Sequence, residues 1–155
     1  MDYNFFPFQK HRFMVEVKEI FNSSDREISS KIRRDVFVLE QGVKEEEEFD
    51  EYDSLSRHFL GFYEKNPCGT ARVRTTENGI KLERFCVLLP YRNRNVGKNL
   101  VLKLVEVATK SNPSQIYLHA QIQALGFYEK LGFAGVGETF LEANIEHIKM
   151  VFAKI

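Results

Sequence analysis

Residues 83–108 read ERFCVLLPYRNRNVGKNLVLKLVEVA, and this stretch decides the fold. A strongly apolar segment runs into Pro90, breaks into a basic turn that contains asparagines, and resumes at helical spacing from Gly97. The first turn of a helix leaves backbone amides unpaired and carries the positive end of the helix dipole, so such a turn binds phosphate readily. The stretch therefore predicts a strand, an anion-binding turn and a long helix.

The turn RNRNVGKN does not match the P-loop of ATP-binding proteins. Gly97 and Lys98 are followed by Asn99 rather than Ser or Thr, and the residue five positions before Gly97 is Arg92 rather than Gly. On these eight residues alone, a basic turn at a solvated helix start is an equally good interpretation.

Upstream, residues 12–20 alternate with period two, which predicts an outer or edge strand with Phe13, Val15 and Val17 on one face. Residues 22–42 predict a long helix. We expect Ser24 as its N-cap with Glu27 three residues later, and Gly42 as its stop. The apolar stripe of this helix comprises Ile28, Ile32, Val36 and Leu39.

Residues 44–54, KEEEEFDEYDS, are interpreted as a charged, solvated connection, although they could also line a site. Residues 57–64 and 69–76 predict two strands, with Pro67 and Gly69 as turn residues between them. The pair Asn78-Gly79 tolerates positive φ at both positions and predicts a second hairpin, closed by a strand over 80–89.

The remaining chain predicts a helix over 96–110, a short buried strand over 115–120, a short helix over 122–132 closed by Gly132, and strands over 133–140 and 145–155. The order is β-α-β-β-β-α-β-α-β-β, without a repeat or a linker. We therefore expect one α+β domain over residues 1–155, built around a mixed, mostly antiparallel sheet and flanked by helices.

The composition excludes several classes of protein. Lys+Arg and Asp+Glu both number 22 and the sequence pI is about 6.9, which argues against a general nucleic-acid binder. The hydrophobic content of 43% with 14 Phe excludes disorder, and no apolar run approaches the roughly 20 residues that span a bilayer. The N-terminus has no secretory signal pattern, and Cys68 and Cys86 form no CxxC. We expect a cytoplasmic protein with reduced thiols and no nucleic-acid or membrane partner.

Residues 92–97 resemble the phosphate signature of the GNAT superfamily of acyl-CoA-dependent N-acyltransferases, which is Arg or Gln, two residues, Gly, one residue, Gly or Ala after a strand. The chain departs from this signature at Asn95, which stands where the signature has its first Gly. Asn is the non-glycine residue that best tolerates the left-handed conformation. Residues 121–133, QIQALGFYEKLGF, are similar to a second motif of the family, with Gln121 in place of Asn.

Three further segments, 32–43, 50–63 and 143–150, are similar to the ElaA-like branch of small GNAT proteins, so the resemblance covers nearly the whole chain from Val15 onward. It implies a GNAT fold in which acetyl-CoA, the acyl donor, lies where two parallel strands splay apart, with no metal. Pantetheine would pair with backbone around Val87 and Leu89, and the pyrophosphate with the amides of residues 94–99. The donor-binding residues that it implies are Phe85, Cys86, Val87, Leu89, Arg92, Arg94, Asn95, Val96, Gly97, Lys98, Asn99, Gln121 and Tyr128.

The resemblance also implies direct attack of a primary amine on the thioester, for which positioning supplies much of the rate. An alkylamine has a pKa of about 10.4, so a general base must help to present its neutral form. Glu83 is the candidate base, acting directly or through water, and His58 and His119 are rival candidates. The alternative interpretation of Glu83 is an exposed strand residue that pairs with Lys81. Tyr128 matches the tyrosine that, in the family, donates a hydrogen bond or a proton to the departing CoA thiolate. The alternative interpretation is that Tyr128 is an aromatic residue packed in the core.

The acceptor is unknown. We expect Glu40, Gln41, His58 and His119 to contact it, and the acids of residues 45–53, if they face inward, favour a cationic amine such as a polyamine, an amino sugar or a lysine side chain. The acceptor is therefore expected to be a small molecule or a peptide, and the protein a monomer or homodimer.

Two other chemistries fit the sequence poorly. Nothing near Cys86 would lower the pKa of its thiol for nucleophilic catalysis, and the spacing of Asp50, Asp53, His58 and His147 matches no known set of metal ligands. Two rival functions remain on the same fold: a non-catalytic CoA-binding sensor, and an interaction module whose basic turn binds an acidic partner.

Overall fold

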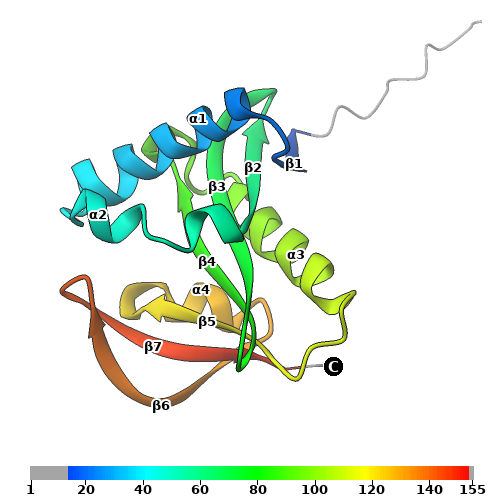
Figure 1. Cartoon of the computed structure of the whole chain (residues 1–155), viewed down its shortest axis with the longest axis vertical. Coiled ribbons are helices and arrows are strands. Elements are labelled where there is room, and N and C mark those ends of the chain that lie inside the picture. The colour runs from blue at the N-terminus through cyan, green and yellow to red at the C-terminus, as the bar shows by residue number, and fades with distance from the viewer. Residues whose placement is uncertain (1–13, 154–155) are drawn as a thin grey trace, which may run out of the picture.

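The computed structural model describes residues 14–153, so the expectation for Phe13 and the end of the last strand lie outside the described residues. Within that range the strands form one seven-stranded sheet of order β1-β2-β3-β4-β5-β7-β6 (Figure 1). The pair β4 and β5 is parallel, and every other neighbouring pair is antiparallel. The strands are β1 (Val15–Glu19), β2 (Arg57–Tyr63), β3 (Asn66–Thr76), β4 (Gly79–Val87), β5 (Ile116–Gln121), β6 (Phe133–Glu142) and β7 (Ile145–Phe152).

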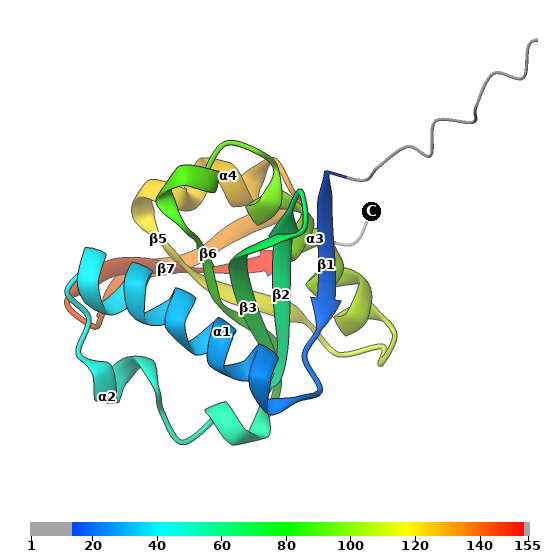
Figure 2. The same cartoon turned by 90° about the horizontal axis from the view of Figure 1, so that it is seen from above.

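Helices cover both faces of this sheet. The long helices are α1 (Ser23–Arg33), which continues into the π-helix η1 (Arg34–Glu40), and α3 (Val96–Thr109). They lie on opposite faces of the sheet (Figure 2). The shorter helices are α2 (Glu45–Glu48), η2 (Asp53–Leu55), η3 (Leu89–Tyr91), η4 (Ile122–Ala124) and α4 (Leu125–Glu129). In the part of the chain that the structure describes, no helix is long and apolar enough to cross a membrane.

The core is divided between the two faces of the sheet. On β2, Phe59 belongs to the cluster beneath α3, and the next residue, Leu60, belongs to the cluster beneath α1 and η1. Successive side chains of a strand point to opposite faces, so one strand contributes to both clusters. The α1 face carries the smaller apolar cluster, and it also carries polar side chains that the site uses.

A β-bulge in β4 changes the course of the sheet. Arg72 pairs with Glu83 and Thr70 with Cys86, so two residues of β4, Arg84 and Phe85, oppose Ala71 alone. Arg84 takes the left-handed conformation with φ of 60°. A bulge bends its strand and increases the local twist.

The parallel strands part at the same level. Their register runs from Ile80 with Ile116 to Leu82 with Leu118, and it ends one residue before the bulge. Beyond this point β4 and β5 splay apart, as the sequence resemblance implied. The predicted element order, the mixed sheet and the edge position of β1 are confirmed.

The first helix differs from the prediction at both ends. Its N-cap is Asn22 rather than Ser24, because the Asn22 side chain accepts a hydrogen bond from the Asp25 amide at 2.8 Å. Towards its end the helix widens: the Gln41 amide donates to the Val36 carbonyl, five residues back. This widening changes the phase of the apolar stripe, so Leu39 is 72% exposed and does not pack in the core.

The hairpin turns also differ in detail. The β2–β3 turn is formed by Glu64 and Lys65, both at positive φ, whereas Pro67 and Gly69 lie within β3. Pro67 is opposite Phe62 of β2, next to a shift of register, and β4 pairs with β3 only from Gly69 onward, so Pro67 lies at an irregular end of the ladder, where proline is tolerated. At the β3–β4 turn the pair Asn78-Gly79 was expected to take positive φ at both positions, but only Gly79 does.

Helix α3 packs on strand positions that lack side chains. A Cβ at Gly61 would lie 2.9 Å from Cγ1 of Val96, and one at Gly69 would lie 3.0 Å from the same atom. Val96 is β-branched and stiff at χ1, so it cannot easily move aside. These glycines therefore set how closely the start of α3 approaches the sheet.

We predict that Gly61→Ala lowers the free energy of unfolding by about 1–3 kcal/mol through this overpacking. Urea denaturation measures the change. Gly126→Ala is the matched control, because a Cβ at Gly126 meets nothing within 4 Å. In a Val96→Ala background the Gly61→Ala change should cost less, and equal stability of Gly61→Ala and the native chain would contradict the proposed contact.

Candidate functional site

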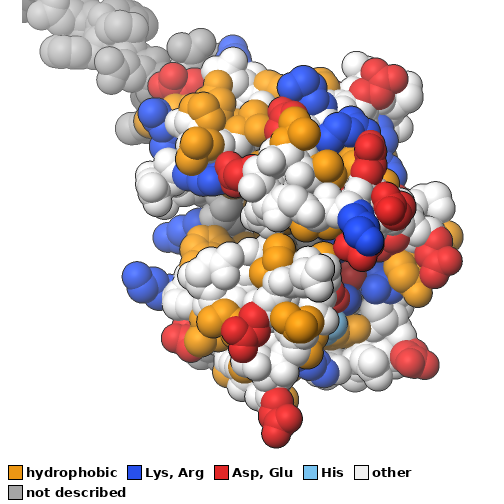
Figure 3. All heavy atoms as spheres, turned by 90° about the vertical axis from the view of Figure 1, so that its left-hand side faces the viewer, with side chains coloured by type: hydrophobic (Ala, Val, Ile, Leu, Met, Phe, Trp, Pro, Cys, Tyr) orange, Lys and Arg blue, Asp and Glu red, His pale blue; other side chains and the backbone are white. Residues whose placement is uncertain are grey.

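The opening between β4 and β5 is a pocket of about 700 Å³ on the α1 face of the sheet. Its walls come from η1, the segment that follows it, β4, β5 and the tip of the β6–β7 hairpin. Figure 3 views this side of the molecule, where acidic and basic side chains lie intermixed. The site is thus built from segments that are distant in sequence and that meet because the strands splay.

Most of the residues expected at the site line this pocket: Glu40, Gln41, Glu83, Phe85, Cys86, Val87, Arg92, His119, Gln121 and Tyr128. Gln121 donates to the side chain of Gln41 at 2.9 Å and so links β5 to the end of η1. Leu89 and residues 94–99 are outside the lining: Leu89 belongs to η3, residues 94 and 95 end the turn before α3, and residues 96–99 form the first turn of α3. His58 is also outside the lining.

The turn before α3 has the backbone that an anion site needs. Asn93 and Asn95 are both left-handed, with φ of 63° and 65°, which confirms the conformation expected of Asn95. The first helical hydrogen bond runs from the Asn99 amide to the Asn95 carbonyl at 3.0 Å. Within residues 14–153, no hydrogen bond from the amides of residues 94–98 is present. These amides are therefore available to a ligand.

Arg92 is directed across the end of β4 rather than along the turn. Its Nε donates to the Val87 carbonyl at 2.8 Å, and its Nη2 donates to both carboxylate oxygens of Glu40, at 3.0 and 2.7 Å. This contact joins the end of η1 to the strand that precedes the turn. Arg94, by contrast, lies over the ring of Tyr63, 5.0 Å from its centroid.

Tyr128 lies in the apolar part of the pocket. It is 8% exposed and packs near Phe85, with ring centroids 6.1 Å apart, and near Phe133 at 6.0 Å. Burial raises the pKa of the phenol, so Tyr128 remains protonated at neutral pH. A protonated phenol in this position can donate a hydrogen bond to a group that enters the pocket.

Glu83 lies on β4 just before the bulge and is buried, not exposed as its alternative interpretation required. Oε2 accepts from Arg72 at 2.6 Å, and Oε1 contacts Lys81 at 3.0 Å and Arg74 at 3.1 Å. Burial acts to raise the pKa of Glu83, but the charges of Arg72, Lys81 and Arg74 outweigh it and lower the pKa below the usual value. Its carboxylate is therefore a weak proton acceptor.

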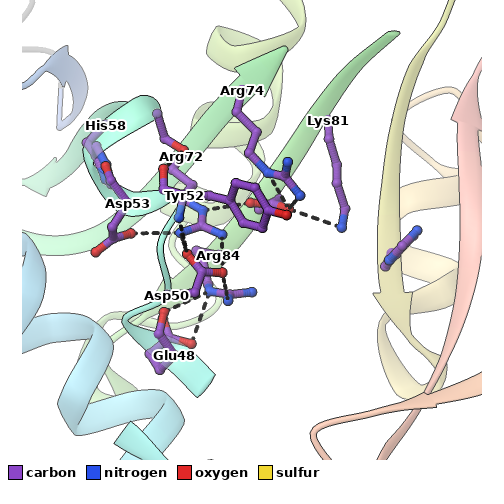
Figure 4. A network of polar contacts seen from close by, with 12 residues as sticks. Glu48, Asp50, Tyr52, Asp53, His58, Arg72, Arg74, Lys81 and Arg84 are labelled. Atoms are coloured by element: carbon purple, nitrogen blue, oxygen red, sulfur yellow. Dashed lines mark hydrogen bonds and ion pairs between the residues drawn. The ribbon is translucent and has the colours of Figure 1, made fainter. Parts of the chain in front are cut away.

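The acidic segment after η1 is not the solvated loop that the sequence suggested. It folds into α2 and η2, and Glu48 is 2% exposed, with Oε1 accepting from Nε of Arg33 at 2.8 Å. Asp50 and Asp53 both accept hydrogen bonds from Arg72. Figure 4 shows this network of Glu48, Asp50, Asp53, Arg72, Arg74, Lys81 and Arg84 between the segment and the sheet. A buried charge left without its partner is costly, which explains why the segment is ordered.

This network also changes the electrostatic argument about the acceptor. Glu48 and Asp50 line the pocket, yet both carboxylates pair with Arg84 as well as with the buried arginines behind it. Acids that are already neutralised by neighbouring arginines offer a cationic acceptor much less attraction than their number suggests. The expected preference for a cationic amine therefore loses its main support.

His58 is a structural histidine, not the acceptor contact that we expected. It is 2% exposed, and its Nε2 lies 2.8 Å from the Asp53 carbonyl oxygen, which requires Nε2 to donate. Within residues 14–153, its Nδ1 has no hydrogen-bond partner. Burial lowers the pKa of His58 to about 4, so the ring is neutral in the folded protein at neutral pH.

His119 lies across the pocket from β4, beside a carboxylate that the sequence gave no reason to select. Its Nδ1 is 3.3 Å from Oε1 of Glu142, and Nε2 of His147 is 3.7 Å from the other oxygen, Oε2. The hydrogen bond with His119 is the main cause that lowers the pKa of Glu142 to about 2. The carboxylate is therefore ionised at neutral pH.

The cysteines and the acidic groups offer no other reaction centre. Cys86 and Cys68 are buried free thiols, and burial raises the pKa of Cys86 and raises that of Cys68 to about 11. Neither is activated as a nucleophile. Among residues 14–153, no group of three or more His, Cys, Asp or Glu side chains is arranged to hold a metal ion.

The segment that the sequence allowed to line a site does so through Glu47, Glu48, Asp50 and Tyr52, whereas the sequence reasoning missed five other residues of the pocket wall: Arg74, Lys81, Arg84, Glu142 and His147. Part of this set had a signal. Arg72 and Arg74 alternate with Val73 on β3, and Lys81 and Glu83 alternate with Leu82 on β4, so each pair shares a face. The contact between His119 and Glu142 had none, because it depends on two long-range pairings, that of β5 with β7 and that of β7 with β6.

Comparison with known proteins agrees with this architecture. A family model described as an acetyltransferase (GNAT) domain matches residues 24–154. The uncharacterized protein YyaT of Bacillus subtilis is 41% identical over 139 residues, which cover 88% of this chain and 94% of YyaT. Protein ElaA of Escherichia coli is 31% identical over 124 residues, which cover 77% of this chain and 81% of ElaA.

Solved structures give the same result. The crystal structure of Escherichia coli ElaA aligns with a TM-score of 0.79 at 27% identity, over 90% of this chain and 100% of that one. A Bacillus subtilis acetyltransferase solved in complex with CoA aligns with a TM-score of 0.67 at 17% identity, over 91% of this chain and 99% of that one. At such a low identity, this second likeness shows the fold alone.

We predict that His58 makes stability depend on pH between about 6.5 and 4. In the unfolded chain the imidazole binds a proton below about pH 6.5, whereas in the folded protein it does so only below about 4, so stability is lost as the pH falls through this window. The full loss is about 3 kcal/mol. Urea titrations at pH 7, 5.5 and 4.5 would show a shallower decline for His58→Gln, and identical slopes for both proteins would refute the assignment.

Proposed function

Because the chain belongs to the GNAT acetyltransferase family, we propose that it transfers an acetyl group from acetyl-CoA to a primary amine by direct attack of the amine on the thioester. No covalent enzyme intermediate is needed, since the thioester is already activated. The two buried, unactivated thiols agree with this route. Free thiols also suit the reducing cytoplasm, where we place the protein.

The observation that carries this proposal is the splay of β4 from β5 next to a turn with free amides. The open edge of β4 beyond Leu82 can pair with the pantetheine amides, and the amides of residues 94–98 can hold the pyrophosphate. A Bacillus subtilis acetyltransferase with the same fold was solved in complex with CoA, and we propose that CoA is the invariant part of the donor here as well. Gly97 has no side chain beyond its Cα, so its backbone can approach a phosphate closely at the start of α3.

In the proposed reaction, Tyr128 assists the departure of the CoA thiolate. The thiol of CoA has a pKa of about 8.5, and a buried phenol is a weaker acid than that. Tyr128 therefore acts first as a hydrogen-bond donor to the sulfur, and it passes on a proton only as the tetrahedral intermediate collapses. Backbone amides of β4 near Val87 are the candidates to stabilise the oxyanion.

The sequence predicted Glu83 as the general base, but the residues around its carboxylate favour a structural role. Arg72, Arg74 and Lys81 all contact its carboxylate, so it organises the cations of the wall rather than holding a free lone pair. We propose that it fixes the shape and charge of the acceptor side of the pocket.

We predict that Gly97→Asp weakens acetyl-CoA binding at least tenfold, because it adds a negative charge to the proposed phosphate site. Calorimetric titration with acetyl-CoA measures the change. The matched control is Gly97→Asn, which has the same shape without the charge; a Cβ at Gly97 meets only ordinary contacts, 3.6 Å from Phe127 and 3.8 Å from Val87. If the native chain does not bind acetyl-CoA, the proposed function is wrong. If it binds but both variants bind equally well, only the location is wrong.

We predict that Tyr128→Phe lowers kcat by about 10–100-fold and leaves the Kd for acetyl-CoA nearly unchanged, because it removes the donor to the thiolate but keeps the ring. CoA release is followed with glucosamine, spermidine and a lysine-containing peptide as acceptors. Tyr117→Phe is the control: its hydroxyl bonds Thr76 at 2.8 Å, outside the pocket. Unchanged turnover of Tyr128→Phe would remove Tyr128 from the mechanism.

A further inference from the structure

Glu83 and His119 occupy equivalent positions on the two strands that part. Lys81 is in register with Tyr117 and Leu82 with Leu118, so the next positions along β4 and β5 are Glu83 and His119. In a parallel pair, residues in register project to the same face of the sheet. Both side chains accordingly line the pocket, one on each side of the opening.

These two candidate bases differ in how many of their proton-accepting atoms already have a partner in the protein. Both oxygens of Glu83 contact cations, at 2.6 to 3.1 Å. His119 uses Nδ1 towards Glu142, and within residues 14–153 no hydrogen bond or ion pair of its Nε2 is present. Its side chain is 24% exposed in the pocket, so the ring is reachable from the cavity.

The state of Glu142 fixes the tautomer of this imidazole. An ionised carboxylate only accepts hydrogen bonds, so the nitrogen that faces it must carry the proton. Nδ1 of His119 is therefore the donor, and Nε2 has its lone pair free. The aromatic ring of Phe140, edge-on at 4.9 Å from the imidazole, holds the ring in this orientation.

From this arrangement we propose that His119 is the general base of the reaction and that Glu142 is its positioning residue. The inference rests on the proposed acetyl transfer. Nε2 takes one proton from the acceptor ammonium and frees the nitrogen lone pair. The N–C bond then forms to give the tetrahedral intermediate. As this intermediate collapses, the C–S bond breaks, Tyr128 gives its proton to the departing thiolate, and the second proton of the nitrogen restores the phenol. His119 afterwards returns its proton to solvent, so one amide, one CoA thiol and one proton are produced.

Other charged groups face this pair from the neighbouring strands. His147 on β7 donates Nδ1–H to the Ile145 carbonyl at 2.6 Å, which leaves its Nε2 directed at Glu142. Lys149 is opposite His119 in the β5–β7 register, although its ammonium lies over the Tyr117 ring at 4.9 Å. On β4, Lys81 is engaged with Glu83. Glu142 thus provides the negative charge nearest to His119.

The first test is the tautomer of His119, which long-range ¹H–¹⁵N correlation spectra of the full chain report without any acceptor. We expect the Nδ1–H form in the native protein. In Glu142→Gln the side-chain amide can donate to Nδ1, so the Nε2–H form should replace it. Glu146→Gln, on the exposed part of the same hairpin, is the matched control and should leave the spectrum unchanged. An Nε2–H form in the native protein would overturn the proposal.

The second test is the pH dependence of kcat/KM for the best of the three acceptors named above. His119→Gln should lower kcat/KM about 100-fold or more near neutral pH and abolish the acidic limb of the profile, with the Kd for acetyl-CoA unchanged. Glu142→Gln should lower it as well, through the wrong tautomer. If His119 had only a structural role, His119→Gln would lower kcat/KM by the same factor at every pH and the acidic limb would remain. That result would refute the assignment of His119 as the base.

The two proposals fail in distinguishable ways. If acetyl-CoA does not bind, the acetyl transfer is wrong, whatever the spectra show. If acetyl-CoA binds and the native protein transfers acetyl groups, while His119→Gln keeps its activity and its acidic limb, only the base assignment is wrong.

Discussion

The site depends on one extra residue in a strand. Between Arg72–Glu83 and Thr70–Cys86, β4 has two residues where β3 has one, and this bulge lies next to the last parallel pair between β4 and β5. A flat continuation of the ladder would place β5 against β4 along its whole length and leave no room for a ligand. The bulge bends β4 away, and the same bend aims Arg84 at the segment that forms the opposite wall.

Ion pairs, rather than apolar packing, hold the wall segment from Glu48 to Asp53 against the sheet. Arg33 and Arg72 are each about 1% exposed, and each is matched by carboxylates of the segment from Glu48 to Asp53. Replacing such pairs by apolar residues of similar volume is often neutral for stability, so their presence is not explained by stability alone. What they provide here is a fixed position for a polar wall beside a cavity, which an apolar wall could not supply.

Local patterns in the sequence were sufficient to predict the strands and the long helices, whereas α2, η2 and the site depend on long-range contacts. Alternation in the strands, the Gly42 stop and the apolar period of α3 depend on neighbours a few residues away, so the order of strands and helices was predictable. The turn at Glu64 and Lys65 was not, since neither residue type signals positive φ. The partners of Glu83 and His119 depend on strand register and on a hairpin that returns from the end of the chain, and no local pattern contains that information.

The ion network has a consequence for how this chain can change over generations. Each carboxylate in it serves more than one arginine, and Asp53 alone contacts both Arg33 and Arg72. Losing one of these acids leaves its buried arginines with fewer carboxylates, so a lineage that replaces the positions one at a time passes through destabilised intermediates. The network is expected to be inherited as a block, while the uncommitted residues of the pocket drift and alter the range of acceptors.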